Sequence, residues 1–442
     1  MAESSDALIA RFLALHPKTI DLSLGRIERL LDQLGNPQRR LPPTIHVAGT
    51  NGKGSTIAFM RAILESAGLA VHVYTSPHLV RFHERIRLGA LGGGHYVSEA
   101  RFVEALRRCE AVNAGAPITV FEITTAAAFL LFSETPADVL LLEVGLGGRV
   151  DATNVLDSVA AAIVTPIGYD HAEYLGTTLE QIAGEKAGIF KRGCPAVIAP
   201  QDYAAADAVL RERAEKTGAK PILVGAQDFS VHEEGGRLVY QDEDGLLDLP
   251  RPRLAGRHQY TNAGSAVAAL RAAGFGGFET SAFESGMTRA EWPGRLQRLA
   301  KGRLPTLAPE GSELWLDGGH NFDGGRVLSA AMADLGERSD VPLVLIAGML
   351  GTKDSEGFFK NFLGLAREVI AVPIPGQIAA RPAEEVAGIA SGVGLTASVQ
   401  PNVEAALASL HEYVWDRPPR VLICGSLYLA GEVLSANGTL PQ

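Results

Sequence analysis

Short apolar runs alternate with longer helical patterns along most of the chain, beginning at Thr44. The runs are rich in β-branched residues and nearly continuous in hydrophobicity, as expected for strands that are covered on both faces. Alternation of this kind is typical of an α/β protein with a parallel sheet. The pattern predicts strands at residues 44–48, 70–75, 138–144 and 161–166, and helices at residues 54–67, 180–190 and 260–273.

Two segments interrupt this alternation. Residues 228–249 predict a small antiparallel hairpin around Gly235-Gly236. Residues 291–305 are rich in Pro, Gly and Arg and predict a linker. Because the alternation restarts after it, we expect two α/β domains, residues 1–294 and 295–442, with a ligand site in the cleft between them. The strands predicted for the second domain are residues 313–317, 342–348, 368–374 and 420–425.

Composition narrows the class of protein. The 442 residues are 46% hydrophobic and 20% charged, the balance of a soluble globular protein, with a net charge of −10 that disfavours nucleic acid or an anionic membrane as partner. Cys109, Cys194 and Cys424 are too few and too widely spaced for a disulfide framework. The N-terminus lacks the pattern of a signal peptide, and the most apolar run, residues 123–132, is too short to span a bilayer. We expect a cytoplasmic monomer.

The first chemical signal is the string HVAGTNGKGST at residues 46–56, a strand followed by a Gly-rich turn, a lysine and a helix. Such a turn lets backbone N–H groups approach a polyphosphate, while Lys53 adds a positive charge and Ser55 a hydroxyl for magnesium. The spacing departs from GxxxxGK[ST], since Gly54 separates the lysine from Ser55. A tight strand–helix connection is the alternative, but the lysine favours a nucleotide-phosphate site.

Several polar groups follow predicted strands, where ligands gather in open α/β sheets. Glu143 ends an apolar strand and could anchor magnesium, or it could pair with Arg149. His171 follows another strand and could ligate a metal or be an ordinary hydrogen-bonded histidine. Lys186 is either a solvated helix residue or a buried amine with a lowered pKa.

The second half of the chain repeats this arrangement. Asp317 and His320 lie in a Gly-rich turn just past a predicted strand, and Arg295 lies in the linker. Alone these residues would be a helix cap, a tight turn and a surface charge. Their positions near strand ends and the domain junction favour a shared site.

The motifs HVAGTNGKGS, TSPHLVRFHERIR, EVGLGGRVDATN, DHAEYLG, EKAGIFK, PGR, LDGGHN and GSLYL together resemble folylpolyglutamate synthase and the bifunctional dihydrofolate synthase/folylpolyglutamate synthase, within the Mur-ligase-like superfamily. They run in family order over nearly the whole chain. The resemblance implies an N-terminal P-loop ATPase domain with a parallel sheet, plus a smaller Rossmann-like C-terminal domain. It also implies ATP and Mg²⁺ as cofactors, with two metal sites.

The resemblance assigns roles by matching positions. Thr50, Asn51, Gly52, Lys53 and Gly54 would cradle the phosphates. Ser55 and Glu143 would bind one magnesium ion, and His171 would help to hold a second. Lys186 would carry a carbamate. Four further residues would contact the nucleotide or help to close the domains: Asn262, Arg295, Asp317 and His320. The familiar DGAHN appears here as DGGHN, which keeps Asp317 and His320.

The resemblance also indicates a folate-binding loop at residues 76–87, with Ser76, His78, Arg81 and Phe82 as candidate substrate contacts. An ordinary basic surface loop is the alternative. The stretch at residues 18–35, together with Phe121 of FEITT and Asp151 of VDATN, is more similar to the bifunctional enzymes, which also use dihydropteroate. These features favour both activities, with a monofunctional folylpolyglutamate synthase as the alternative.

The implied chemistry joins L-glutamate to the carboxylate of dihydropteroate or a reduced folate through an acyl phosphate. Magnesium, Lys53 and Arg295 would offset the repulsion between carboxylate and ATP, and His171, Lys186 and His320 are further candidate catalytic groups. Three alternative interpretations remain: a P-loop kinase, a cell-wall amino-acid ligase of the same superfamily, and a nucleotide-binding regulatory protein. The DATN and SPHL motifs disfavour the cell-wall ligase.

Overall fold

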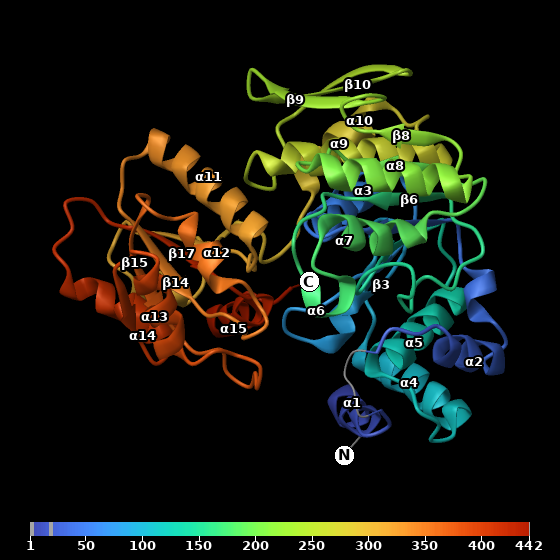
Figure 1. The fold of residues 1–442 in the computed structure, drawn as a ribbon, viewed down its shortest axis with the longest axis horizontal. Coiled ribbons are helices and arrows are strands. Elements are labelled where there is room, and N and C mark those ends of the chain that lie inside the picture. Colours follow the sequence, from blue (N-terminus) through green and yellow to red (C-terminus); the bar gives the residue numbers. More distant parts are fainter. Residues whose placement is uncertain (1–3, 17–20, 442) are drawn as a thin grey trace.

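The computed structural model describes residues 4–16 and 21–441, and its N-terminal part is built on an eight-stranded sheet (Figure 1). The order is β4-β3-β2-β5-β1-β6-β7-β8, and all pairs are parallel except those that β3 makes with β2 and β4. The strands are β1 (Thr44–Ala48), β2 (Val71–Tyr74), β3 (Ile86–Leu88), β4 (His95–Tyr96), β5 (Val139–Glu143), β6 (Ala161–Val164), β7 (Ala196–Ile198) and β8 (Ile222–Val224).

The four strands predicted for this part are confirmed as β1, β2, β5 and β6. Their side chains are all buried, because helices cover the sheet on both faces. The sequence pattern missed β3, β4, β7 and β8. These strands are only two or three residues long, too short for a periodicity to emerge.

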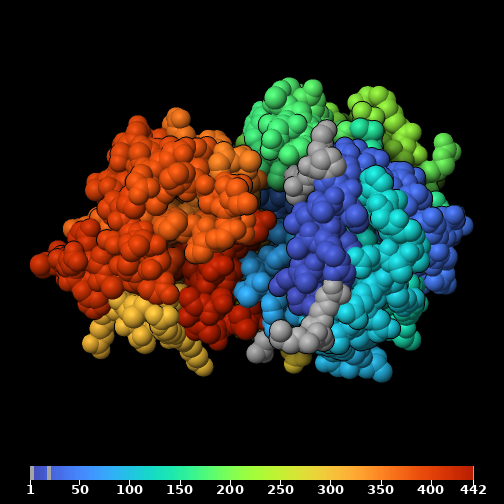
Figure 2. Space-filling view, turned by 90° about the horizontal axis from the view of Figure 1, so that it is seen from below, coloured from blue at the N-terminus to red at the C-terminus, as the bar shows by residue number. Residues whose placement is uncertain are grey.

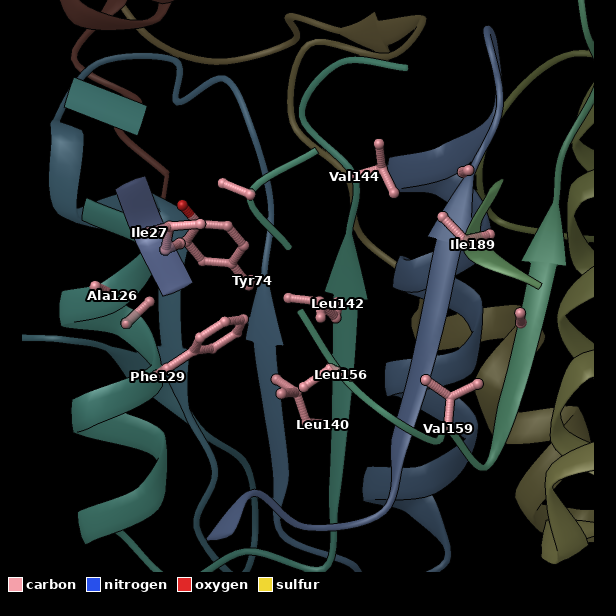
Figure 3. Close-up of a cluster of buried hydrophobic side chains, with 14 of the residues drawn as sticks. Ile27, Tyr74, Ala126, Phe129, Leu140, Leu142, Val144, Leu156, Val159 and Ile189 are labelled. Carbon is pink, nitrogen blue, oxygen red and sulfur yellow. The ribbon is translucent and has the colours of Figure 1, made fainter. Parts of the chain in front are cut away.

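Helices on the two faces form separate cores. One core packs α3, α9 and α10 against the sheet, and the other, drawn in Figure 3, packs α5 and its neighbours against strand residues such as Leu140 and Leu142. The helices of this part are α1 (Ser5–Leu13), α2 (Gly25–Gln33), α3 (Lys53–Ser66), α4 (Glu99–Asn113), α5 (Val120–Glu134), α6 (Ala172–Leu175), α7 (Leu179–Lys186), α8 (Ala204–Thr217), α9 (His258–Leu270) and α10 (Thr280–Arg289).

The most apolar run of the chain lies inside α5, where it is buried against the sheet. In the part of the chain that the structure describes, no helix is both long enough and apolar enough to cross a membrane.

Two predicted helices end earlier than expected. The first, α7, gives way to the 3-10 turn η3 (Ala187–Ile189), and α9 continues as the π-helical turn η4 (Arg271–Phe275), where Gly274 has a φ of 86°. Apolar periodicity continues through both turns, so it did not show these ends.

The predicted hairpin around Gly235-Gly236 exists, but it belongs to a three-stranded antiparallel sheet. The third strand pairs with β10 along its own whole length and was missed because it is mostly exposed. This small sheet lies over α9 (Figure 1). Its strands are β9 (Ser230–Glu234), β10 (Arg237–Asp242) and β11 (Gly245–Leu249).

A six-stranded sheet forms the C-terminal part, in the order β12-β13-β17-β14-β15-β16. Every pair is parallel except β12 with β13. The four predicted strands are confirmed as β13, β14, β15 and β17. The elements are β12 (Gln297–Arg298), β13 (Glu313–Leu316), β14 (Leu343–Ala347), β15 (Ala366–Ala371), β16 (Ala397–Val399), β17 (Arg420–Cys424), α11 (Phe322–Arg338), α12 (Ser355–Lys360), α13 (Ala383–Gly392), α14 (Val403–Ser409) and α15 (Leu427–Asn437).

The segment predicted as a linker is not wholly irregular. Its residues Gln297 and Arg298 form β12 and pair with β13, and the 3-10 turn η5 (Leu304–Leu307) follows. The two parts lie side by side, and the red C-terminal helix α15 lies at their junction (Figures 1 and 2). The C-terminal part contacts the N-terminal part through turns and through α11 and α15: Lys353 pairs with Asp170, Asp334 of α11 with Arg257, and Gly431 of α15 lies against Leu79.

Candidate active site

The phosphate loop, residues 49–55, connects β1 to α3. Gly49 and Gly52 have φ values of 146° and 90°, which favour glycine, and a β-carbon on Gly52 would collide with Asn262. The ammonium of Lys53 folds back over the loop and donates hydrogen bonds to the carbonyl oxygens of Gly49 (3.1 Å) and Thr50 (3.2 Å). Burial lowers the pKa of Lys53, against the opposing charges of Glu143 and Asp170.

Glu143 is buried at the carboxyl end of β5, opposite Val47 of β1. It accepts a hydrogen bond from the backbone N–H of Ser76 at 3.3 Å. Burial raises its pKa, and the nearby charge of Lys53 opposes that shift. The alternative pairing with Arg149 is wrong, because that guanidinium binds Glu185 at 2.9 Å. Glu143 therefore faces the phosphate loop and remains available to a cation.

Lys186, at the end of α7, is 5% exposed, so the interpretation as a solvated lysine is wrong. Its ammonium donates to the carbonyl oxygen of Gly49 at 2.9 Å. Burial, together with the like charge of Lys53, lowers the pKa of Lys186 to about 7. A large fraction of this side chain is therefore an uncharged, nucleophilic amine near neutral pH.

Asp170, just after β6, is the centre of a charged cluster that crosses between the two parts. Its carboxylate receives the ammonium of Lys353 at 2.6 Å and lies 3.5 Å from Nε2 of His320. Burial alone would raise the pKa of Asp170, but the hydrogen bond from His320 and the charges of His320 and Lys353 hold it well below its usual range. His171 lies 3.8 Å away, and burial lowers its pKa to about 4, which leaves a neutral imidazole.

The turn after β13 supplies the facing wall. Asp317 accepts hydrogen bonds from the backbone N–H groups of Leu296 (2.7 Å) and Gly319 (2.6 Å), so it ties the linker to this turn. Burial raises the pKa of Asp317, and the charge of Arg295 opposes that shift. The ring of His320 hydrogen-bonds through Nδ1 with the carbonyl oxygen of Gly318 at 2.8 Å.

These groups line one cavity of about 550 Å³ between the two parts of the chain. The predicted site residues that it brings together are Thr50, Asn51, Gly52, Lys53, Gly54, Ser55, Ser76, Glu143, His171, Lys186, Asn262, Arg295, Asp317 and His320. The predicted substrate residues outside its walls are His78, Arg81, Phe82, Phe121 and Asp151.

Phe121 and Asp151 lie directly behind the wall of the cavity. The ring of Phe121 contacts Gly145, and Asp151 accepts a 2.9 Å hydrogen bond from the backbone N–H of Leu146; Gly145 and Leu146 both line the cavity. Asp151 is fully buried and also accepts the hydroxyl hydrogen of Thr153 at 2.5 Å. Burial raises the pKa of Asp151, and these hydrogen bonds oppose the rise.

The loop at residues 76–87 is held by its own side chains. The ring of Phe82 stacks on Phe102 with centroids 5.8 Å apart and carries the guanidinium of Arg85 over it at 4.3 Å. His78 accepts a hydrogen bond from Arg85, and burial lowers its pKa to about 3. Arg81 donates to the carbonyl oxygen of Pro441 at 3.0 Å. The loop is therefore held in place by contacts of its own side chains.

Sequence reasoning missed Lys353 and Asn321. Lys353 lies in the GTKD turn after β14, and Asn321 donates weakly, at 3.4 Å, to both Asn51 and Asp170. The only sequence signal was position, since both follow strands of the second sheet as His320 does. A lysine in a polar turn carries no distinguishing pattern in the sequence, so only its tertiary contact with Asp170 reveals it.

The donor set fits magnesium held jointly with phosphate oxygens. Among residues 4–16 and 21–441, no group of three or more His, Cys, Asp or Glu side chains is arranged to hold a metal ion. Mg²⁺ commonly takes one or two protein oxygens and completes its shell with water and phosphate. The carboxylate of Glu143 and the hydroxyl of Ser55, both buried beside the phosphate loop, are oxygen donors of that kind.

Comparisons with known proteins agree with this geometry. Residues 47–270 match the family model for the Mur ligase middle domain, and residues 303–436 match that for the dihydrofolate synthetase C-terminal domain. Folylpolyglutamate synthase of Lacticaseibacillus casei is 36% identical over 92% of this chain and 92% of its own length. Dihydrofolate synthase/folylpolyglutamate synthase of Escherichia coli is 33% identical over 95% of this chain and 92% of its own.

Solved structures give the same result. The structure of Escherichia coli FolC in complex with DHPP and ADP has a TM-score of 0.87 at 30% identity, covering 98% of this chain and 97% of its own. That of the bifunctional folylpolyglutamate synthase/dihydrofolate synthase of Yersinia pestis, complexed with AMPPNP and Mn ion, has a TM-score of 0.85 at 30% identity and covers 98% of each chain. By sequence, by fold and by the lining of its interdomain cavity, this chain belongs to the folylpolyglutamate synthase/dihydrofolate synthase family of ATP-dependent ligases.

Proposed function

We propose that the chain joins L-glutamate to dihydropteroate and to tetrahydrofolate through an acyl-phosphate intermediate, as a bifunctional dihydrofolate synthase/folylpolyglutamate synthase. The observation that carries this proposal is the single cavity in which a phosphate loop, Lys53 and Glu143 face Arg295 and His320 from the other part. A kinase would need only the phosphate loop, Lys53 and Glu143. A second wall of polar groups suits a reaction with three substrates.

The proposed role of each residue follows from its position in the cavity. Gly52, Lys53 and Gly54, flanked by Thr50 and Asn51, offer backbone N–H groups and a cation to the β- and γ-phosphates. Ser55 and Glu143 would hold one Mg²⁺, which supplies charge neutralisation when bound. A second Mg²⁺ is proposed beside His171, whose ring stays neutral and can donate a lone pair.

In the first step the substrate carboxylate displaces ADP from the γ-phosphoryl group of ATP. The incoming carboxylate and the phosphates are both anionic, so their repulsion dominates the barrier. Lys53 lies within the loop and Arg295 faces it across the cavity, so both cations can oppose this charge as it develops. The role of Lys53 is electrostatic, because Gly49 and Thr50 already fix its ammonium in place.

In the second step the amine of glutamate attacks the acyl carbon, and phosphate leaves. The attacking amine must be neutral and must lose a proton as the amide forms. His320 lies at the cavity wall with Nδ1 engaged by Gly318, so Nε2 faces Asp170 and the reaction space. We assign proton handling to His320, which lies at the cavity wall beside Asp170.

A carbamate on Lys186 is the third proposal. Its amine lies 2.9 Å from the carbonyl oxygen of Gly49, between Lys53 and Asp170, and its pKa of about 7 leaves free amine to react with CO2. The new N–C bond forms with loss of one proton from nitrogen. A carbamate would replace a positive charge beside Lys53 with a negative one, which suits a metal ligand.

The pteridine substrate is proposed to bind behind the phosphate loop. Phe121 supports Gly145 at the cavity wall, and Asp151 offers a buried carboxylate to ring nitrogens. Ser76, His78, Arg81 and Phe82 belong to the adjoining loop, which we assign to the folate end of longer substrates. Two acceptor regions are what a bifunctional enzyme requires, and the Escherichia coli structure in complex with DHPP and ADP supports dihydropteroate-type acceptors.

We also propose the domain division at residues 294 and 295, with an N-terminal ATPase domain and a smaller Rossmann-like C-terminal domain. Strands of the eight-stranded sheet end at Val224, and those of the six-stranded sheet begin at Gln297. Glutamate is assigned to the C-terminal side of the cavity. A related bifunctional enzyme has been solved with Mn, AMPPNP and L-glutamate bound, which supports a glutamate site in this fold.

The decisive assay combines purified protein, ATP, Mg²⁺ and labelled glutamate with either dihydropteroate or tetrahydrofolate. We expect labelled amide product and equimolar ADP with both acceptors. Product with tetrahydrofolate alone would establish the monofunctional alternative. ADP formation that does not depend on glutamate would favour a kinase, and nucleotide binding without turnover would favour a regulatory protein.

A further inference from the structure

A second cavity, of about 440 Å³, lies beside the interdomain linker and is separate from the active site. Its walls come from four places: the face of α3 that carries Arg61 and Glu65, the sheet edge at β3 and β4, the end of α10, and the chain segment at residues 439–441. Trp292 of the linker forms part of the wall. The same ring lies against Gly54, since a β-carbon there would be 2.5 Å from it. The cavity therefore adjoins the back of the phosphate loop.

Three guanidinium groups face this cavity, from Arg61, Arg87 and Arg289. Arg87 is 14% exposed, and its buried Nε has no hydrogen-bond partner in the part of the chain that the structure describes. Arg61 makes a single long hydrogen bond, 3.5 Å to the carbonyl oxygen of Glu291. For Arg289, on the last turn of α10, no hydrogen bond or ion pair is found among the described residues.

The three glutamates in the same walls are already engaged. Glu84 accepts the backbone N–H groups of Leu79, Val80 and Arg81 at 2.9 to 3.1 Å. Glu291 pairs with Arg253 at 2.7 Å. Among the described residues, no hydrogen bond or ion pair joins either of these carboxylates to Arg61, Arg87 or Arg289.

Glu65 is the third carboxylate, and Arg87 must share it. It lies 3.7 Å from Nε of Arg87 and accepts the backbone N–H of Gly94 at 3.2 Å. Arg61 and Arg87 line the same cavity, and burial, together with the like charge of Arg61, lowers the pKa of Arg87. Arg87 is therefore a largely buried cation that shares its carboxylate, in a cavity lined by two further guanidiniums, and an anion there would offset this charge.

We propose that this cavity binds a small polyanion, with oxyanion groups held by Arg61, Arg87 and Arg289. Guanidinium forks bind phosphate and carboxylate oxygens in pairs, and three of them on different walls require a ligand with at least two anionic groups. Tyr96, beneath the guanidinium of Arg87 at 5.9 Å, adds a hydroxyl, because burial raises its pKa and keeps it protonated. A polyphosphate and a polycarboxylate share this chemistry.

Occupancy of the cavity bears on the active site through Trp292. An anion held by Arg61 and Arg289 bridges α3 to the end of α10, and the linker leaves from there. Because Trp292 separates the anion from Gly54, binding fixes the linker against the phosphate loop. The site is thus placed to bias the approach of the two parts, which the ligase reaction requires.

The test uses the full chain with saturating Mg²⁺ and AMPPNP, so that the nucleotide site is filled. Pyrophosphate and tricarballylate are titrated separately at constant ionic strength, with binding followed by calorimetry and by tryptophan fluorescence. We expect saturable binding of at least one probe. Binding of pyrophosphate alone would identify phosphate esters as the ligand class, and binding of tricarballylate alone would identify polycarboxylates. Binding of both probes would identify a site that recognises the number of negative charges.

Variants connect the binding to the cavity. R61Q and R87Q should each weaken it about tenfold, the effect of losing one charge-assisted hydrogen bond. R237Q is the matched control, because Arg237 is exposed on β10 and pairs with Asp248. R61Q alters a partly exposed side chain, so it keeps the test valid even where R87Q fails to fold. Absence of saturable binding by either probe, or R61Q binding like wild type, would overturn the proposal.

Discussion

At the residue scale, the active site depends on ionisable groups that are buried in unlike surroundings. Lys53 and Lys186 both donate to the carbonyl oxygen of Gly49, yet they differ in their neighbours. Lys53 lies near Glu143 and Asp170, whose charges favour its ammonium form, whereas Lys186 has Lys53 itself as its strongest charged neighbour. One lysine is thus suited to neutralise phosphate charge and the other to react as an amine.

Replacing Lys53 tests the electrostatic role. We expect Lys53→Ala to lower kcat for ADP formation by about 10²–10³-fold, because a preorganised cation opposite developing charge is lost. Far-UV circular dichroism should be unchanged, since the side chain bonds only within its own loop. Lys216→Ala, which removes an exposed lysine paired with Glu212, is the control. Wild-type ADP release from the Lys53 variant would remove that residue from its proposed role.

The pKa of Lys186 predicts a pH-dependent modification. Below its pKa of about 7 the side chain is an ammonium and cannot attack CO2, and above it the free amine predominates. With ¹³C-labelled bicarbonate we expect a carbamate carbon signal that grows between about pH 6 and pH 8. The signal should vanish in Lys186→Arg. A carbamate signal of equal size in that variant, or one that falls as pH rises, would contradict the proposal.

At the element scale, most functional groups lie at or near the end of a strand or a helix. Helix α5 shows how this works. Its N-cap Thr119 accepts the backbone N–H of Glu122, and Glu122 accepts the N–H of Thr119 in return. Glu122 also binds Arg26 of α2 at 2.9 Å, which fixes the end of the helix that carries Phe121.

This capping predicts a measurable loss of stability. We expect Thr119→Ala to lower the free energy of unfolding by about 1 kcal/mol in urea denaturation, since a buried N-cap hydrogen bond is lost. Ser98→Ala at the exposed start of α4, where the cap distance is 3.4 Å, should cost less. Equal effects at both positions would show that burial does not strengthen the cap.

A chain of hydrogen bonds joins β1 to the proposed pteridine site. The hydroxyl of Thr153 donates to Asp151 at 2.5 Å, so its oxygen must accept from Nε2 of His46, 2.9 Å away within β1. Burial lowers the pKa of His46 to about 3, which keeps this ring neutral. The strand that leads into the phosphate loop therefore also orients Asp151.

Breaking this chain should affect one substrate only. We expect Thr153→Val to raise KM for dihydropteroate several-fold, because Asp151 loses a hydrogen-bond donor. KM for ATP should stay the same, because the phosphate loop loses no hydrogen bond. Thr124→Val removes a hydroxyl that bonds within α5, so it serves as the control. Parallel rises in both KM values would point instead to a general loosening of the fold.

At the scale of the whole molecule, the two parts are joined around the cavity by charged and polar pairs. Lys353 and His320 reach Asp170, Arg257 of the N-terminal part binds Asp334 of α11 at 2.8 Å, and Tyr203 donates to Asp323 at 3.0 Å. The pair of Arg257 with Asp334 is largely exposed, and exposed pairs are individually weak, whereas Lys353 and Asp170 are only 10% and 12% exposed. We expect these contacts to break when the parts separate for substrate entry and to form again when they close for reaction.

Lys353, whose side chain is 10% exposed, tests closure. We expect Lys353→Met to increase the radius of gyration measured by X-ray scattering with AMPPNP and Mg²⁺, because Asp170 loses its closest cation. Water should then reach the acyl phosphate, so ADP release should exceed amide formation. Lys360→Met, which removes an exposed lysine paired with Glu356, should change neither quantity. An unchanged radius and full coupling would exclude Lys353 from closure.

The sequence by itself determined much of the frame. Buried runs such as residues 44–48 and 420–425 are strands because continuous β-branched runs between turns have few other stable arrangements. The phosphate loop could also be predicted, because its glycines and its lysine lie close together in the sequence. The family motifs brought in Asn262, Arg295 and Asp317, which local chemistry could not distinguish from surface residues.

Only the tertiary structure decided which charges meet. The pairing of Arg149 with Glu185, the burial of Lys186, and the contact of Lys353 with Asp170 all depend on groups far apart in sequence. A pKa or an ion pair is set by distance and by exclusion of water, and neither is written in the local pattern. The same reason explains the arginine-lined second cavity, because no motif marks three guanidiniums that come together from three separate elements.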